Sequence, residues 1–307
     1  MTFLKYLILC SSLLGFSQET VFKFTVNQLN KELNIYATQS AHGAENFAVK
    51  DLELSEIEMQ IYFEKEEQIT STDSISMYAA ISITQSKINA LLFILMGNKE
   101  TAKHDLRHVI NDELAIVKSE DNKLYNFSLD QKTGGSYRSR ISWMYYLEDH
   151  AYIDISSSFD SDDNMNSDSI FFPDGYHDIK TFNSHNKTWY LLFGSVRGCG
   201  ACFEEYVTLT HFEDNTLQLD FEYSVVSRVA EQRIFYEAFS KSLSVFYDTD
   251  DLTTDCYCED QDLNNRIYEE DDTEDIQESS TYSCSCLFEF SKDTFKLLKQ
   301  CAERIKG

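Results

Sequence analysis

The chain of 307 residues carries 52 acidic and 26 basic side chains, which gives it a formal charge of −26. Such a charge repels the phosphates of nucleic acid and argues against a nucleic-acid-binding protein, whereas it is compatible with a cationic partner or a divalent ion. Aromatic residues make up 14% of the chain, so the composition predicts a packed core and not a disordered chain.

Residues 1–17 predict a cleavable signal peptide. One positive charge precedes an apolar run that is too short to span a bilayer, and Gly15 and Ser17 occupy the small-residue positions of a cleavage site. A lipid anchor on Cys10 is disfavoured because Leu9 precedes it where a small residue is expected. We therefore expect cleavage after Ser17 and a location in the periplasm, at the outer membrane or outside the cell.

Residues 18–118 predict a partly helical region. The run V-F-K-F-T-V at 21–26 alternates and predicts a short strand. Residues 52–68 fit both a helix and a strand, and we favour a helix because Glu and Gln are good helix formers. We predict a further helix over residues 99–117.

Residues 74–96 are apolar enough to predict a buried helix, with Gly97 placed as its C-terminal cap. The most apolar part, residues 88–96, is too short to cross a bilayer. We therefore expect no membrane-spanning segment after the signal peptide.

From residue 119 onward the pattern changes to strands, and we predict that 119–307 form an antiparallel β-rich region. Residues 124–129 alternate as a half-buried strand does, and Gly134 and Gly135 are suited to a tight reversal. Aromatic and apolar residues then recur on the expected returning strand, at Tyr137, Ile141, Trp143 and Tyr145. We predict a core hairpin here. A ligand-binding Gly-Gly loop is the alternative, but it lacks the Lys-Ser/Thr ending of a phosphate-binding loop.

Later strands follow from apolar runs and turn residues. Residues 188–195 predict a central strand, 284–290 a last strand and 294–305 a terminal helix. Two hairpins are predicted, from 206–212 with 216–223 and from 234–238 with 242–247. Acidic insertions interrupt the pattern at 160–178 and 248–280. The predicted fold class is α+β: a partly helical N-terminal region, an aromatic-rich antiparallel sheet and a short C-terminal helix.

Two segments carry a resemblance. S-E-D-N-K-L-Y-N-F-S-L-D-x-x-T-G-G at 119–135, and T-W-Y-L-L-F-G at 188–194 followed by hairpins, resemble segments of uncharacterised exported bacterial proteins. The likeness covers roughly residues 119–247, and those proteins often carry Trp where this chain has Leu129. The resemblance implies a shared fold and an envelope or extracellular location. It implies no established activity, so no functional residue is carried over.

Seven cysteines remain after cleavage, and an exported location favours disulfides. They are Cys199 and Cys202 in C-G-A-C, Cys256 and Cys258 in C-Y-C, Cys284 and Cys286 in C-S-C, and Cys301. Residues two apart on a strand share a face, so we predict two bridges between 256/258 and 284/286, in either matching. A zinc site made by the same four thiolates is the alternative, but C-x-C spacing is less usual for zinc than C-x-x-C.

The C-G-A-C motif follows an apolar strand, a placement similar to that of thioredoxin-like redox sites. A redox pair normally opens a helix, whereas a β-patterned run follows here, and Glu204 and Glu205 disfavour a thiolate. We therefore predict a structural disulfide between Cys199 and Cys202. Thiol-disulfide activity through this pair is an alternative function.

The acidic insertions hold the candidate calcium ligands, which are Asp160, Asp162 and Asp168. An EF-hand loop needs Gly at its sixth position and Glu at its twelfth, where this chain has Met165 and Phe171. A solvated loop is the default, and a looser calcium site is the alternative. The cluster at 269–275 similarly predicts a mobile acidic loop, with ion binding as the alternative.

The remaining motifs predict no enzyme. His104 and His108 would share a helix face at i, i+4, but we predict a surface pair because the Glu of H-E-x-x-H is absent. Ser195 directly follows Gly194, so G-x-S-x-G is absent too. We predict an exported, non-catalytic binding or structural protein without a cofactor. The alternatives are a divalent-cation-dependent binding protein that uses the acidic loops and the thiol-disulfide protein.

Overall fold

The computed structural model describes most of the chain in eight stretches. They are residues 17–40, 46–63, 72–133, 139–156, 175–197, 203–227, 233–249 and 282–304. The described residues up to 156, with Gly175, form a first compact unit, and residues 176–304 belong to a second. The boundary predicted at residues 118/119 lies inside the first unit.

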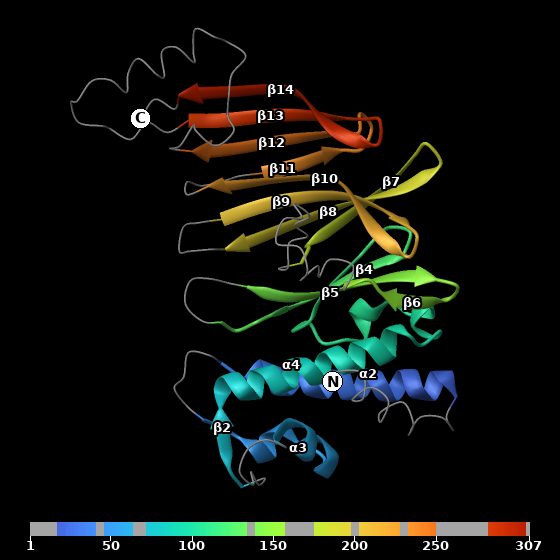
Figure 1. Ribbon diagram of the computed structural model, residues 1–307, viewed down its shortest axis with the longest axis vertical. Coiled ribbons are helices and arrows are strands. Elements are labelled where there is room, and N and C mark those ends of the chain that lie inside the picture. Colours follow the sequence, from blue (N-terminus) through green and yellow to red (C-terminus); the bar gives the residue numbers. More distant parts are fainter. Residues whose placement is uncertain are drawn as a thin grey trace, which may run out of the picture. The chain divides into compact units, whose positions relative to one another are not determined.

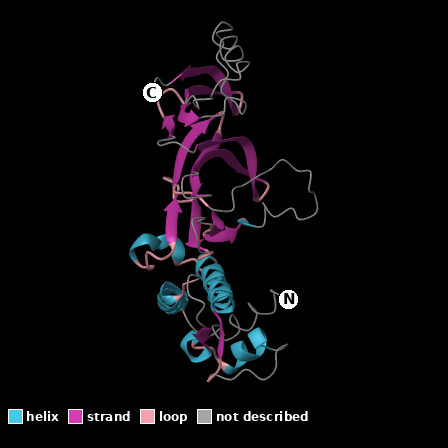
Figure 2. Ribbon diagram, turned by 90° about the vertical axis from the view of Figure 1, so that its left-hand side faces the viewer, coloured by secondary structure: helices cyan, strands magenta, loops and turns pink. Residues whose placement is uncertain are grey.

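The first unit contains all the α-helices of the described residues (Figure 2). Its helices are α2 (Gln18–Thr38), α3 (Glu56–Phe63) and α4 (Met77–Met96), and its strands are β1 (Asn46–Ala48), β2 (Ser74–Ser76), β3 (Ala115–Lys118), β4 (Leu124–Asp130), β5 (Arg140–Glu148) and β6 (Ala151–Asp154). Strands β3 to β6 form an antiparallel sheet in sequence order, and β1 pairs with β2. Helices α2 and α4 lie side by side (Figure 1).

The main core of the first unit lies between these two helices and one face of the β3–β6 sheet. The helices contribute Leu29 and Leu33 from α2 with Leu92 and Leu95 from α4, all buried. The sheet contributes Phe127 and Tyr145, whose rings meet edge to face at 5.8 Å. A smaller cluster joins β2, α3 and the start of α4 and is made by Val49, Leu52, Phe63, Ile75, Ala80 and Ile83.

Helix α2 occupies the predicted strand at 21–26, so that prediction was wrong. The alternating run is the first part of a helical stripe, because buried residues recur at three- and four-residue steps through Phe22, Val26, Leu29, Leu33 and Tyr36. The helix begins after Ser17, whose Oγ accepts a hydrogen bond from the Thr20 amide at 3.3 Å.

The C-terminus of α2 is capped from the loop after β4. The last turn of α2 has no basic residue of its own. Instead, Lys132 Nζ donates to the backbone oxygens of Tyr36 at 2.5 Å and Gln39 at 2.9 Å. A cation at this end complements the helix dipole. The residue Lys132, just after the predicted strand at 124–129, therefore also fixes the end of a helix.

The predicted helix at 99–117 is also wrong. Only two single 3₁₀ turns form there, Thr101–Lys103 and Leu106–His108, and β3 follows. Asp105 accepts hydrogen bonds from the backbone amide of Arg107 at 3.2 Å and from its guanidinium at 2.6 Å. These local bonds compete with a continuous helix.

Two helix predictions are confirmed. Residues 74–96 contain α4, with Ser76 accepting from the Ala79 amide at 3.2 Å and Gly97 at the C-cap. Helix α3 lies within 52–68. By length and composition α4 as a whole is long and apolar enough to cross a membrane, whereas our expectation rested on the shorter run at 88–96; 56% of its most apolar 18-residue window is buried.

A buried ion pair joins α2 to α4. Lys87 Nζ lies 2.6 Å from Glu32 Oε1, and the two side chains are 9% and 6% exposed. Lys87 also donates to the Leu52 carbonyl at 3.2 Å. Burial raises the pKa of the Glu32 carboxyl, and Lys87 opposes that rise.

The second unit is a sandwich of two antiparallel sheets. One contains β7 (Asp178–Ser184), β8 (Lys187–Arg197), β9 (Phe203–Glu213) and β10 (Thr216–Ser227); the other contains β11 (Arg233–Glu237), β12 (Ser242–Thr249), β13 (Tyr282–Ser291) and β14 (Thr294–Arg304). Each sheet follows the chain order (Figure 1). Side chains of both sheets share one core, with Trp189 and Leu191 from the first and Leu243 and Val245 from the second.

The predicted α+β class is wrong, because strands dominate the described residues and arrange in four antiparallel sheets. The predicted helix at 294–305 is β14, which pairs with β13 from Ser291↔Thr294 to Tyr282↔Arg304. Cross-strand pairing outweighs the local helix pattern there. The predicted strands at 124–129, 188–195 and 284–290 are confirmed as parts of β4, β8 and β13.

Two-residue turns close four of the hairpins without glycine. Both turn residues have positive φ in Asp149-His150, His185-Asn186, Asp214-Asn215 and Lys292-Asp293. This geometry matches the twist of the flanking strands, and Asn, Asp and His tolerate it better than most residues do. The hairpins predicted around 213–215 and 239–241 are confirmed.

A candidate site around His211

His211 is a polar side chain in a core position of the sandwich. Along β9 it follows the buried Val207 and Leu209 in the inward alternation, and it is 7% exposed. Its cross-strand neighbour is Trp189 on β8, and the two ring centroids are 5.0 Å apart. A buried imidazole at such a position requires hydrogen-bonding partners.

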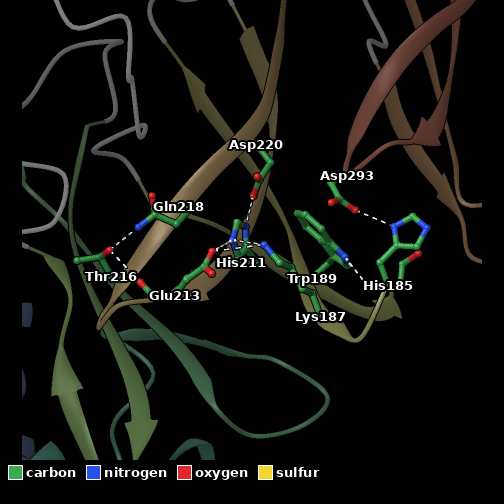
Figure 3. A network of polar contacts seen from close by, with 10 residues as sticks. His185, Lys187, Trp189, His211, Glu213, Thr216, Gln218, Asp220 and Asp293 are labelled. Carbon is green, nitrogen blue, oxygen red and sulfur yellow. Dashed lines mark hydrogen bonds and ion pairs between the residues drawn. The ribbon is translucent and has the colours of Figure 1, made fainter.

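The first partner is Asp220, whose Oδ2 lies 2.6 Å from His211 Nδ1 (Figure 3). Asp220 sits at an irregularity of the β9–β10 ladder. The register passes from Leu219↔Thr210 to Phe221↔Leu209, so Asp220 has no residue opposite it. A bulge of this kind re-aims a side chain, and here the carboxylate reaches the imidazole.

The other imidazole nitrogen meets two charged groups. His211 Nε2 lies 2.9 Å from Glu213 Oε2 and 3.1 Å from Lys187 Nζ (Figure 3). Lys187 also contacts Glu213 at 3.3 Å. Four ionisable side chains from β8, β9 and β10 thus form one network around the ring.

The network accommodates two protonation states of His211. A carboxylate only accepts hydrogen bonds, so Nδ1 carries the proton in both states and donates to Asp220. As an imidazolium, His211 also donates from Nε2 to Glu213; as a neutral ring, its Nε2 accepts from Lys187. Burial raises the pKa of Asp220 against the hydrogen bond from His211, whereas hydrogen bonds from His211 and Lys187 lower the pKa of Glu213.

Further contacts tie this end of the sandwich together across its two sheets. Thr294 Oγ1 donates to the Asp220 carbonyl at 2.9 Å, which links β14 to β10. His185 Nδ1 lies 2.8 Å from Asp293 Oδ1, which links two hairpin turns (Figure 3). Lys241 Nζ donates to the Asn183 carbonyl at 3.2 Å. The network therefore joins strands and sheets.

The same network has a solvent-facing side. The side chains of Glu213 and Lys187 are 54% and 39% exposed, against 9% for His211 and 17% for Asp220. Among the residues that the structure describes, no group of three or more His, Cys, Asp or Glu side chains is arranged to hold a metal ion. The arrangement therefore consists of a buried His211–Asp220 contact beneath an exposed pair of Lys187 and Glu213.

Most residues singled out from the sequence lie outside the described stretches. These are Cys199, Cys202, Cys256, Cys258, Asp160, Asp162, Asp168 and the cluster at 269–275. Their predicted disulfides and ion sites stay predictions.

Cys284 and Cys286 lie two apart on β13 and are both buried in the sandwich core, so they share a face as predicted. Cys284 is in a disulfide whose partner is not among the described side chains. Cys286 carries a thiol, 3.7 Å from the Tyr223 hydroxyl. The two predicted bridges between 256/258 and 284/286 stay a prediction, because Cys256 and Cys258 lie outside the described stretches.

His104 and His108 do not share a helix. The His104 ring stacks on Phe22 with centroids 4.3 Å apart. His108 is 80% exposed, and its Nε2 lies 3.9 Å from Asp105. The pair has no common ligand geometry, and both side chains serve local contacts.

The sequence interpretation missed His211, Asp220, Glu213 and Lys187. One signal for His211 was available, because counting back from the turn at Asp214 and Asn215 places it on the inward side of the strand. No local sequence pattern predicts the bulge that displaces Asp220. Comparison with protein-family models and with curated proteins finds no match for this chain.

Proposed function

We propose that this chain is an exported, non-catalytic binding protein whose second unit presents the outer face of the β11–β14 sheet to a protein partner. The observation that carries the proposal is the pair Phe235 and Phe246, which are 49% and 47% exposed. Their rings meet edge to face, with centroids 6.4 Å apart. Exposed aromatic side chains that touch one another are typical anchors of protein interfaces.

Strand alternation explains why these two rings point away from the core. On β11, Ile234 and Tyr236 pack against the sandwich core, and Phe235 between them is on the opposite side. On β12, Val245 is fully buried and Phe246 follows it. The sandwich is therefore packed without either phenylalanine, and their exposure is available for a partner.

The His211 network supports a binding role over a catalytic one. Both nitrogens of His211 are engaged by carboxylates of the same sheet, at 2.6 Å and 2.9 Å. A general base must be within reach of a substrate proton, and this imidazole is largely buried under its own partners. Its contacts stabilise the scaffold that carries the aromatic pair.

The signal peptide predicted at residues 1–17 supports the proposed export. Processing after Ser17 would leave a chain that begins at the first residue of α2, where the Gln18 carbonyl accepts a hydrogen bond from Asn98 Nδ2 at 2.9 Å. Mass spectrometry of the N-terminal peptide from the mature protein should therefore begin at Gln18. A mature protein that retains residues 1–17 would contradict export by cleavage.

Site-specific photo-cross-linking tests the binding surface. We would place benzoylphenylalanine at Phe235 or Phe246 in the exporting cell, and at Phe93 of α4, which is 44% exposed, as the matched control. We expect one discrete protein adduct at the first two positions and none at the third. When the probe is at one of these two positions, replacing the phenylalanine at the other with Ser should reduce the yield of the adduct at least tenfold. Absence of adducts at both positions, or the same adducts at Phe93, would overturn the proposal.

A further inference from the structure

The outer edge of the β11–β14 sheet is formed by β14, which follows β13 at the end of the strand order (Figure 1). The Phe290 amide donates to the Lys241 carbonyl at 3.0 Å, so the backbone groups of Phe290 point away from β14. Phe295 lies opposite Phe290. In an antiparallel ladder, opposite residues turn their backbone groups in opposite directions, so the N–H and C=O of Phe295 face the outer edge.

The exposed side chains along this edge are of two kinds, apolar and positively charged. Leu297 and Leu298 are 51% and 60% exposed. Leu297 lies opposite the buried Phe288, on the core side of the sheet, and Leu298 occupies an irregularity of the ladder. Lys296 and Lys299 are exposed and lie opposite Glu289 and Leu287, on the outer side. The edge thus offers apolar surface on one side and two cations on the other.

Neither of these two lysines forms an ion pair with a carboxylate inside the described part of the chain. Lys87, Lys132 and Lys187 each contact a carboxylate at 3.4 Å or less. No such ion pair is found for Lys296 or Lys299 among the described residues, even though Glu289 lies opposite Lys296. The two exposed lysines place two positive charges on one strand edge of a chain whose formal charge is −26.

The charges of Lys296 and Lys299 indicate which kind of strand could pair with this edge. A second copy of β14 would bring its own lysines beside Lys296 and Lys299, and such like-charge neighbours disfavour pairing. An acidic strand converts the same lysines into attractive partners. The lysines therefore oppose self-association and favour a negatively charged segment.

We propose that the outer edge of β14 binds an extended acidic peptide segment as a fifth strand of the sheet. Its backbone would pair with the open groups of β14, beginning at Phe295. Glutamate or aspartate at alternate positions would face Lys296 and Lys299, and the apolar residues between them would cover Leu297. The inference rests on the proposed function and specifies the chemistry of the partner.

Peptide binding to the full mature chain tests the inference. The probe is a fluorescein-labelled ten-residue peptide in which Glu alternates with Val, and the comparison peptide has Lys in place of Glu. Fluorescence anisotropy should show saturable binding of the Glu peptide, at least tenfold tighter than that of the Lys peptide. N-methylation of alternate amides should abolish it if the backbone pairs with β14.

Charge reversal locates the site. The double variant Lys296→Glu and Lys299→Glu should lose at least tenfold in affinity for the Glu peptide and gain affinity for the Lys peptide. The matched control is Lys99→Glu with Lys123→Glu, which makes the same charge change at exposed positions of the first unit and should have little effect. Circular dichroism checks that both variants remain folded.

Three binding or association results would overturn the inference, and a fourth follows them. They are equal affinity for the two peptides, unchanged binding in the Lys296→Glu and Lys299→Glu variant, and a dimer of the parent chain that this variant abolishes. No saturable binding of the Glu peptide would overturn it as well. If adducts still form at Phe235 in that case, only the partner chemistry is wrong. If neither assay shows binding, the proposed function falls too.

Discussion

Replacing His211 with Gln should destabilise the sandwich in a pH-dependent way. The substitution removes the imidazole contact to Asp220 at 2.6 Å and the contact to Glu213 at 2.9 Å. A hydrogen bond to a charged group contributes about 1.5–3 kcal/mol, and Asp220 is only 17% exposed. The contact to Glu213, whose side chain is 54% exposed, is screened by solvent and adds little. We therefore expect a loss of about 1.5–3 kcal/mol at pH 7, mainly from the Asp220 contact.

The sign of the pH dependence follows from Asp220. Burial already raises its pKa, and the hydrogen bond from His211 opposes that rise. Without the imidazole the pKa of Asp220 should rise further. A carboxyl with a raised pKa in the folded state contributes stability below its unfolded pKa and loses that contribution as the pH rises through the folded value. The variant should therefore be closest to the parent near pH 4 and furthest from it at pH 7.

Guanidinium unfolding at both pH values measures this difference, followed by the fluorescence of the buried Trp189 in chains that carry Trp143→Phe, since Trp143 lies in the first unit. The control is Glu213→Gln, which keeps the Asp220 contact and should cost much less than His211→Gln, because the Glu213 side chain is exposed. A loss below about 0.5 kcal/mol in His211→Gln at pH 7, or an equal loss at both pH values, would show that the network does not stabilise the fold as argued.

Three further substitutions test other contacts by denaturant unfolding. Lys87→Met should cost about 3–5 kcal/mol because it leaves the buried Glu32 carboxylate without its partner at 2.6 Å. Adding Glu32→Leu should recover much of this loss, and no recovery would count against the ion pair. Gly194→Ala should cost about 1–3 kcal/mol, since its Cβ would lie 2.0 Å from the Tyr206 ring, and an unchanged midpoint would contradict that overlap. Lys292→Gly should raise stability by up to about 1 kcal/mol because φ is +55° there, and a lower midpoint would refute this account of the turn.

How far the sequence predicts the fold depends on which contacts decide each element. The strand at 188–195 was predictable because a continuous apolar run suits a strand covered on both faces, as β8 is. The runs at 21–26 and 294–305 are compatible with both a helix and a strand. Contacts with residues far away in the sequence therefore determine which of the two forms. The first joins the stripe that continues through Leu33, and the second pairs with β13.

The candidate site was harder to predict than the fold for a physical reason. The hairpin around Asp214 and Asn215 follows from turn composition, and its register then places His211 inside the sandwich. The main partner of His211 is Asp220, which would face away from the core in an unbroken alternation with Leu219 and Phe221. Only the ladder irregularity brings its carboxylate to Nδ1, and such bulges leave no local sequence signal.

The total charge of the chain constrains how an acidic partner can reach β14. At about 10 mM salt, where charges interact over roughly 30 Å, the approaching peptide experiences the repulsion of a chain carrying −26. At about 150 mM salt this range falls to roughly 8 Å, so Lys296 and Lys299 act locally while more distant carboxylates are screened. Added salt should therefore speed association of the acidic peptide over this interval, whereas a positively charged surface would bind it more slowly. Slower association on adding salt would mean that attraction extends well beyond these two lysines.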